Sequence, residues 1–63
     1  MTNYYRDFYG GSASIKTLQD GSVRLIVYDG HGRMVLKKSY ASKRGARIAM
    51  SKLSDGWHEH KKG

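Results

Sequence analysis

The sequence predicts an α+β fold in which a three-stranded antiparallel β-meander packs on one C-terminal α-helix. Two β-favouring runs, 12–18 and 23–28, flank a turn in which Gly21 can supply the positive φ of a three-residue hairpin loop. A second turn leads into a third β-favouring run, 33–40, and a segment with helical periodicity follows it. The length of 63 residues allows one domain with one modest core.

The predicted domain spans residues 12–57, between two segments of different composition. Residues 1–11 form an aromatic arm that ends at a flexible Gly-Gly break, and residues 58–63 form a polar basic tail. The aromatic residues of the arm are Tyr4, Tyr5, Phe8 and Tyr9. These rings either fold back to complete a small core or stack on unpaired bases.

The expected register gives the sheet one apolar face and one mixed face, because residues that face each other across strands share a side. A four-residue loop at 29–32 places Leu25 opposite Leu36 on the apolar side. Val27 then faces Met34 on the same side. On the mixed side, Tyr28 faces Arg33, Ile26 faces Val35 and Arg24 faces Lys37. The three-residue loop of the first hairpin adds Ile15 to the apolar side and Lys16 to the mixed side.

The helix is expected to begin after Ser42, a good N-cap, and to end near Ser54, with Gly56 as its stop. Its apolar stripe has the spacing of one buried face and comprises Ala46, Ala49, Met50, Leu53 and Trp57. Three cations lie in the first turns outside this stripe: Lys43, Arg44 and Arg47. Because these cations oppose the helix dipole, their position favours an anion nearby.

Charge is unevenly distributed along the chain. Twelve Lys and Arg residues against five Asp and Glu residues give a formal net charge of +7. No acidic residue lies between Gly30 and Ser54, whereas the aspartates fall at expected turns and element ends, where they serve local geometry. A concentrated positive field of this kind favours a polyanionic ligand.

The order strand, strand, strand, helix is shared by three families that this sequence resembles. The residue-level pattern of the YegP-like bacterial proteins is matched by Gly32, Met34, Val35, Tyr40, Ser42, Lys43, Gly45, Ala46, Ala49 and Met50. This resemblance implies the fold more than a function.

The other two resemblances imply nucleic-acid binding. The AP2-type and integrase arm-binding domains, in which a three-stranded sheet enters the DNA major groove, are similar at Gly32, Arg33, Tyr40, Ser42, Lys43 and Ala46. That likeness would put Arg24, Arg33 and Lys37 on the DNA. The last helix of double-stranded-RNA-binding domains, whose cations grip phosphates, is similar at Ser42, Lys43, Arg44, Ala46, Arg47 and Ala49.

Two groups of residues are therefore candidate binding sites. The first is the mixed sheet face, where cations and an aromatic ring can meet phosphates and base edges together. Its residues are Lys16, Arg24, Tyr28, Arg33 and Lys37. The second is the helix start, with Lys43, Arg44 and Arg47, where free backbone N–H groups also point. The alternative for each group is an ordinary solvated surface.

Catalysis, metal binding and membrane insertion find little support in the sequence. There is no cysteine, and no arrangement of serine, histidine and acid suggests a nucleophile. His58 and His60, with His31, lack the four-ligand spacing of a structural zinc site. No segment is apolar over the roughly 18 to 20 residues of a membrane span, and no signal peptide is apparent. We therefore expect a cytoplasmic protein that is not an enzyme and has no cofactor.

The predicted function is duplex nucleic-acid binding by the sheet face and the helix N-terminus, with double-stranded DNA ahead of double-stranded RNA. The alternative is a protein-interaction or inhibitor module, such as a phage or plasmid regulator would use. In that alternative, Ile26, Tyr28 and Val35 form a hydrophobic centre ringed by cations. This centre would meet an acidic protein partner or a second copy of the chain, so the protein is expected to be a monomer or a homodimer.

Overall fold

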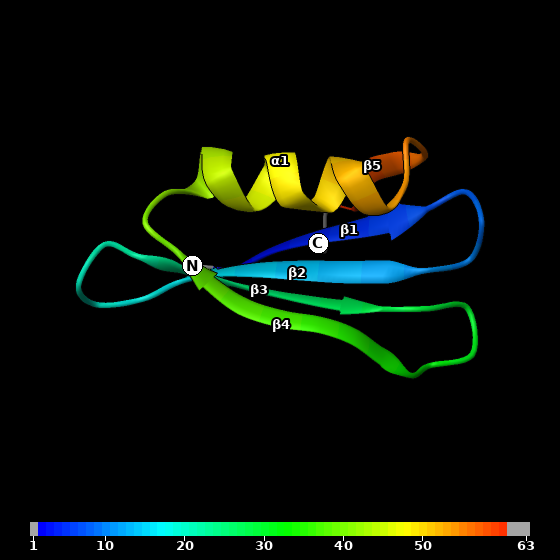
Figure 1. Cartoon of the computed structure of the whole chain (residues 1–63), viewed down its shortest axis with the longest axis horizontal. Helices are drawn as coiled ribbons and strands as arrows, with labels where there is room; N and C mark the ends of the chain where they lie inside the picture. The colour runs from blue at the N-terminus through cyan, green and yellow to red at the C-terminus, as the bar shows by residue number, and fades with distance from the viewer. Residues whose placement is uncertain (1, 61–63) are drawn as a thin grey trace.

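The computed structural model describes residues 2–60, which contain five strands and one helix. In chain order they are β1 (Thr2–Asp7), β2 (Ser12–Thr17), β3 (Val23–Tyr28), β4 (Met34–Tyr40), α1 (Lys43–Leu53) and β5 (Trp57–His60). The strands form one antiparallel sheet in the order β4-β3-β2-β1-β5, and α1 packs on one face of it (Figure 1). The predicted class, an antiparallel sheet with one helix, is confirmed.

The prediction of three strands followed by a C-terminal helix was wrong at both ends of the chain. Thr2–Asp7, which we expected in an arm, forms β1 between β2 and β5. Trp57–His60 forms the edge strand β5, so the helix is followed by one more strand. The predicted order is present as β2-β3-β4-α1, with a strand before it and a strand after it. Residues 61–63 of the expected tail lie outside the described residues.

The three hairpins of the meander β1 to β4 share one turn geometry. In each turn, the first residue donates its N–H to the carbonyl oxygen four residues later and accepts a bond from the fourth residue. That fourth residue is always a glycine with positive φ, and the three glycines stand 11 residues apart: Gly10, Gly21 and Gly32. This is a three-residue hairpin loop with a glycine bulge, which only a residue without Cβ adopts cheaply. The predicted role of Gly21 and the predicted place of Ile15 on the apolar side of the sheet are both confirmed.

A β-bulge in β4 overturns the predicted register of the second hairpin. Tyr28 pairs with Met34, whereas Val27 pairs with Leu36, so Val35 is the extra residue of the bulge. Arg33 closes the turn opposite Asp29, whose N–H donates to the Arg33 carbonyl oxygen at 2.9 Å. Arg33 is therefore a loop residue and does not face Tyr28.

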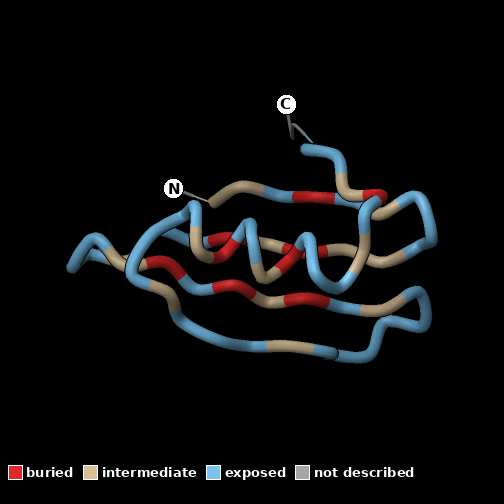
Figure 2. Tube along the Cα trace, turned by 45° about the horizontal axis from the view of Figure 1, so that its top comes forward, coloured by how far each residue is buried: buried red, intermediate tan, exposed pale blue. Residues whose placement is uncertain are grey.

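The bulge changes which residues of β4 face the helix. Val27 faces Leu36 on the helix side, and Met34, which we expected in the core, is 57% exposed opposite Tyr28. The remaining pairs also differ from those predicted: Leu25 with Lys38, Ile26 with Lys37, and Arg24 with Ser39. As the edge strand, β4 has no fully buried residue, and Figure 2 shows buried positions on the inner strands and the helix instead.

The helix has the predicted boundaries, and two of the five residues of the predicted stripe are buried in it. The Ser42 hydroxyl accepts a hydrogen bond from the Gly45 N–H at 3.3 Å, which caps the first turn. Ala46 and Met50 are buried against the sheet. Two predicted stripe residues behave differently: Leu53 is 48% exposed, and Trp57 belongs to β5. Leu53 lies at the last turn of α1, where it is only half covered by the rest of the described chain.

The core lies between α1 and the inner strands β1, β2 and β3. Ile15 and Leu25 are fully buried at its centre, with 0% of their surface exposed. The other buried members of this cluster are Tyr5, Ala13, Val23, Val27, Ala46 and Met50. Trp57 joins the cluster from β5 and donates its Nε1–H to the Met50 carbonyl oxygen at 2.8 Å. The same carbonyl oxygen accepts the Ser54 N–H at 3.4 Å, and the additional bond from Trp57 ties β5 to α1.

We predict that Leu25→Ala destabilises the protein far more than Leu53→Ala. Leu25 is fully buried, and removing a buried leucine side chain leaves a cavity that typically costs about 2–5 kcal/mol. Leu53 already has half its surface in water, so its truncation removes less packing. Urea denaturation of the two variants beside the wild-type protein measures the difference. Equal decreases in unfolding free energy would contradict the burial described above.

Aspartate side chains hold the hairpin turns, as the sequence suggested. The Asp29 carboxylate accepts hydrogen bonds from the backbone N–H of His31 at 2.8 Å and of Arg33 at 3.0 Å. These bonds, the one from Arg33 first, lower the pKa of Asp29 below its ordinary value. In the β2–β3 turn, bonds from the hydroxyl and the N–H of Ser22 lower the pKa of Asp20.

We expect stability to fall in acid, and Asp29→Asn to reduce that fall. Because the pKa of Asp29 is lower in the folded than in the unfolded protein, its contribution is complete above the ordinary aspartate pKa of 3.8. The contribution disappears as the pH falls through the folded pKa. Asparagine can accept the same bonds but does not titrate. Melting temperatures measured by circular dichroism between about pH 5 and pH 2 should therefore drop less steeply for Asp29→Asn. Parallel curves for the variant and the wild type would refute this role of Asp29.

Candidate nucleic-acid interface

The face of the sheet that points away from α1 is not covered by any element of the described chain. Side chains alternate along each strand, so cross-strand partners define three rows on this uncovered face. The first row is His58, Arg6, Ser12, Tyr28 and Met34. The second is His60, Tyr4, Ser14, Ile26 and Lys37. The third is Thr2, Lys16, Arg24 and Ser39.

Positive charge is not balanced by acids on the uncovered face. Four strands each contribute one cation, and these are Arg6, Lys16, Arg24 and Lys37. All five acidic residues lie in the described part of the chain, yet none occupies a position of these rows. Asp7 and Glu59 alternate to the helix side, where they line two other hollows, and the remaining aspartates lie in loops. The face therefore presents an uncompensated positive field.

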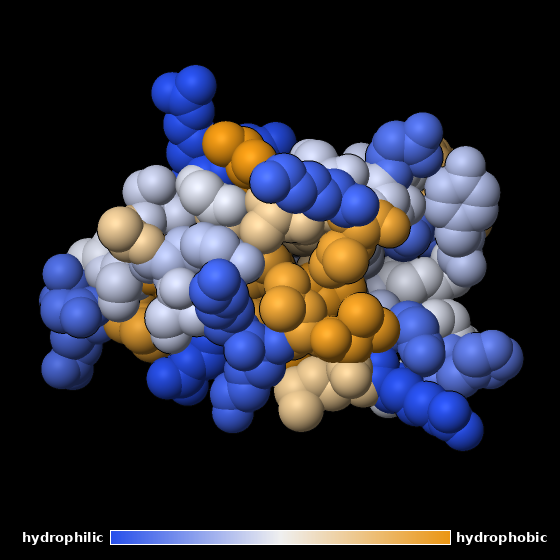
Figure 3. Space-filling view, in the orientation of Figure 1, coloured by the Kyte–Doolittle hydropathy of each residue, from blue (hydrophilic) through white to orange (hydrophobic). Residues whose placement is uncertain are grey.

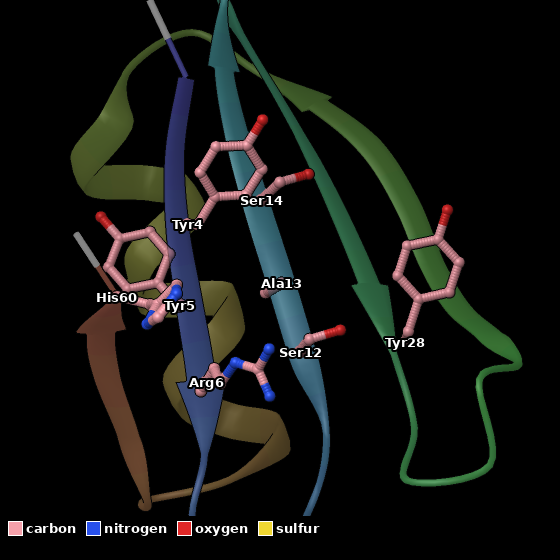
Figure 4. Close-up of a pocket in the computed structure, with 8 residues that line it drawn as sticks. All are labelled: Tyr4, Tyr5, Arg6, Ser12, Ala13, Ser14, Tyr28 and His60. Atoms are coloured by element: carbon pink, nitrogen blue, oxygen red, sulfur yellow. The ribbon is translucent and has the colours of Figure 1, made fainter. Parts of the chain in front are cut away.

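The middle of the uncovered face is hollowed above β2. There, β2 contributes the small side chains of Ser12 and Ser14, while the neighbouring strands contribute Tyr4, Arg6 and Tyr28. A hollow of about 320 Å³ results, and Figure 4 shows the two tyrosine rings on opposite sides of the serines. Tyr4 and Tyr28 are each 40% exposed, so part of each ring is open to solvent.

The structure brings together four of the five sheet residues that we predicted as a site. Lys16, Arg24, Tyr28 and Lys37 share the uncovered face. Arg33 is the exception, because it lies in the β3–β4 loop and is tied to Asp29 through its backbone.

The helix cations gather elsewhere. Lys43, Arg44 and Arg47 line a shallow hollow of about 370 Å³ on α1, together with Ile48 and Ser51. Because α1 packs on the other face of the sheet, this group and the uncovered face lie on opposite layers of the molecule (Figure 1). One short stretch of nucleic acid cannot lie on both groups at once.

Tyr4 and Arg6 belong to the uncovered face, but the sequence interpretation placed both in the arm, where it left base stacking by the Tyr4 ring open and did not consider Arg6. It took Gly10-Gly11 as a flexible break, so it placed the preceding residues in an arm rather than a strand. The spacing of 11 residues between Gly10, Gly21 and Gly32 is the signal that could have revealed the first hairpin. A strand over 2–7 would have put Tyr4 and Arg6 on one face and Tyr5 on the other.

The hydrophobic centre that we expected for a protein partner is divided: Ile26 and Tyr28 share the uncovered face, whereas Tyr28 and Val35 line a different hollow. Ile26 lies on the uncovered face opposite Lys37. Val35 instead lines a hollow of about 240 Å³ with Leu53 and Trp57, at the end of the molecule where the β3–β4 bulge lies. Figure 3 shows apolar side chains gathered between the helix and β4 in this view.

Metal binding, membrane insertion and known relatives give no further assignment. In residues 2–60, no cluster of three or more His, Cys, Asp or Glu side chains could hold a metal ion. The helix of the described segment is neither long nor apolar enough to cross a membrane. Comparisons with protein-family models, with curated proteins and with solved structures find no match to this chain.

Proposed function

We propose that this protein binds nucleic acid through the uncovered face of its sheet. The observation that carries the proposal is that, within residues 2–60, this face combines cations from four strands with two exposed tyrosine rings and has no carboxylate side chain. Cations of this kind attract phosphates, and aromatic rings and hydroxyl groups can contact bases. An acidic protein surface could pair with the cations, but that pairing would not require two tyrosine rings beside the small serine side chains.

The dimensions of the sheet bear on how duplex DNA could dock. Five strands at a spacing of about 4.8 Å make a face about 19 Å wide, and strands of six residues make it about 20 Å long. The major groove of B-DNA is only about 12 Å wide. The groove docking expected from three strands is therefore less favourable for the complete sheet. A strand of nucleic acid lying flat across the face makes fuller contact.

Neutralisation of phosphates is the expected source of affinity. Lys16 faces Arg24 directly across β2 and β3, which places two positive charges side by side in the third row. Arg6 and Lys37 extend the field to β1 and β4. Each neutralised phosphate releases a counterion, so binding should weaken steeply as salt rises.

We predict that the double variant Lys16→Gln/Arg24→Gln binds nucleic acid more weakly than Lys43→Gln/Arg44→Gln. Both variants remove the same charge, so a difference between them reports where the ligand lies. The slope of log affinity against log salt should fall by about 0.7 to 0.9 for each phosphate that is no longer neutralised, and only in the sheet variant. Fluorescence anisotropy with labelled duplex DNA, duplex RNA and single strands at several salt concentrations measures it.

Two outcomes would count against the proposal. A larger decrease in affinity in the helix variant would move the site to the hollow of Lys43, Arg44 and Arg47. If no nucleic acid bound at low salt, a protein partner would become the leading candidate. The hollow between Val35 and Leu53 would then be the surface to test.

A further inference from the structure

We infer that the hollow above β2 stacks two unpaired bases of one strand, one on Tyr4 and one on Tyr28, which makes single-stranded nucleic acid the preferred ligand. This inference rests on the proposed function and specifies its ligand. On the uncovered face, the side chains of β2 in this hollow are smaller than those of β1 and β3 beside them. Ser12 and Ser14 form the floor of the hollow, and larger side chains of β1 and β3 stand on both sides of it.

The two rings are placed to take separate bases. Tyr4 faces Ser14, which faces Ile26, and Tyr28 lies two residues further along β3. Two strand spacings and two residue steps put the Cα atoms of Tyr4 and Tyr28 about 12 Å apart. For side chains that stand upright on the sheet, this separation is larger than the gap between two rings that sandwich one flat base. Each ring can instead stack its own base, and the strand crosses the serines between them.

Arg6 is positioned for the backbone between the two bases. It follows Tyr4 by two residues on β1, and through Ser12 it lies in the same cross-strand row as Tyr28. Figure 4 shows its guanidinium group pointing from β1 toward β2, on which Ser12 lies. A phosphate that links nucleotides on the two rings would lie within this field, and the serine hydroxyls can donate to or accept from base edges.

Base pairing would prevent this arrangement. In a duplex, the faces of each base are covered by neighbouring base pairs, so a tyrosine can stack only where a base is unpaired or at an end. In a single strand, the base faces are accessible, and aromatic stacking tolerates any base. Because both DNA and RNA supply phosphates and stacking bases, the shared chemistry is that of an unpaired strand, and experiment must separate the two.

The test compares Tyr4→Ala and Tyr28→Ala with Tyr9→Ala. Tyr9 is 75% exposed and lines a hollow on the helix side, so its truncation is a matched removal of a surface ring. The ligands are oligo(dT) and oligo(U) of about 12 nucleotides, the corresponding duplexes, and a DNA strand of equal length without bases. The abasic strand keeps the phosphates and removes the stacking partners.

We expect Tyr4→Ala and Tyr28→Ala each to bind oligo(dT) or oligo(U) roughly 5- to 150-fold more weakly, as the removal of one stacked base implies. Tyr28→Phe should retain wild-type affinity because it keeps the ring, and Tyr9→Ala should bind like the wild type. The wild-type protein should bind the abasic strand and the duplexes more weakly than the matching single strand. Thermal melts of each variant verify that it is folded.

The inference and the proposed function can fail separately. Equal affinity for abasic and normal strands, with weaker binding only in Lys16→Gln/Arg24→Gln, would overturn base stacking and leave phosphate binding in place. Tighter binding of duplexes than of single strands would also overturn it. Absence of binding to every strand at low salt would overturn both.

Discussion

A single helix has to cover a sheet of five strands, and this constraint divides the molecule into two unlike surfaces. The 11 residues of α1 extend about 16 Å, which is enough to cover the inner strands. Because the described chain has one helix, only one face of the sheet is covered. Strict alternation then sends apolar residues such as Ile15 and Leu25 under the helix and leaves Lys16 and Arg24 facing solvent. Ala46, which has no exposed surface, keeps the helix close to the sheet because its side chain is small. Because the core lies on one face of the sheet, the other face is left exposed and forms the candidate interface.

The geometry of the turns fixes the register of the strands and therefore the face of the sheet on which each side chain lies. A shift of one residue in register would exchange the two faces of a strand, so the position of the turn glycine matters as much as the hydrophobic pattern. The identical hydrogen bonding around Gly10, Gly21 and Gly32 holds β1, β2 and β3 in matched register. In β4, the bulge at Val35 shifts the register by one residue and places Leu36 on the helix side. A bulge and charged side chains on an edge strand also discourage pairing with other chains.

Local signals in the sequence predicted the parts of the fold that local interactions determine. Ser42 and the spacing of Ala46 and Met50 indicated the helix, and Gly21 indicated the register of β2 on β3. The bulge at Val35 was not predictable from alternation, because a bulge breaks the pattern by which a strand is recognised. β5 has four residues and no apolar periodicity, and long-range bonds place it, such as the one from the Phe8 N–H to the Gly56 carbonyl oxygen at 3.1 Å.

The candidate site, like the fold, was predicted only where local sequence signals identified the strands that carry its residues. Lys16, Arg24, Tyr28 and Lys37 were assigned to one face because they lie on strands that the sequence indicated. The placement of Arg33 on that face was wrong because Arg33 closes the β3–β4 turn opposite Asp29, and Tyr4 and Arg6 were not assigned to the face because β1 was not predicted. The helix cations are separated from the sheet face because α1 packs on the apolar side of the sheet, as the apolar stripe of the helix implied.

The uncovered face is tested most directly by lysine acetylation footprinting with and without a bound single strand. The chain offers lysines on both layers: Lys16 and Lys37 on the uncovered face, and Lys43 and Lys52 on α1. If the nucleic acid lies on the uncovered face, mass spectrometry should show slower acetylation of Lys16 and Lys37 in the complex. The rates at Lys43 and Lys52 should be unchanged. Protection of Lys43 and Lys52 with unaltered rates at Lys16 and Lys37 would contradict the assignment of the uncovered face as the binding surface.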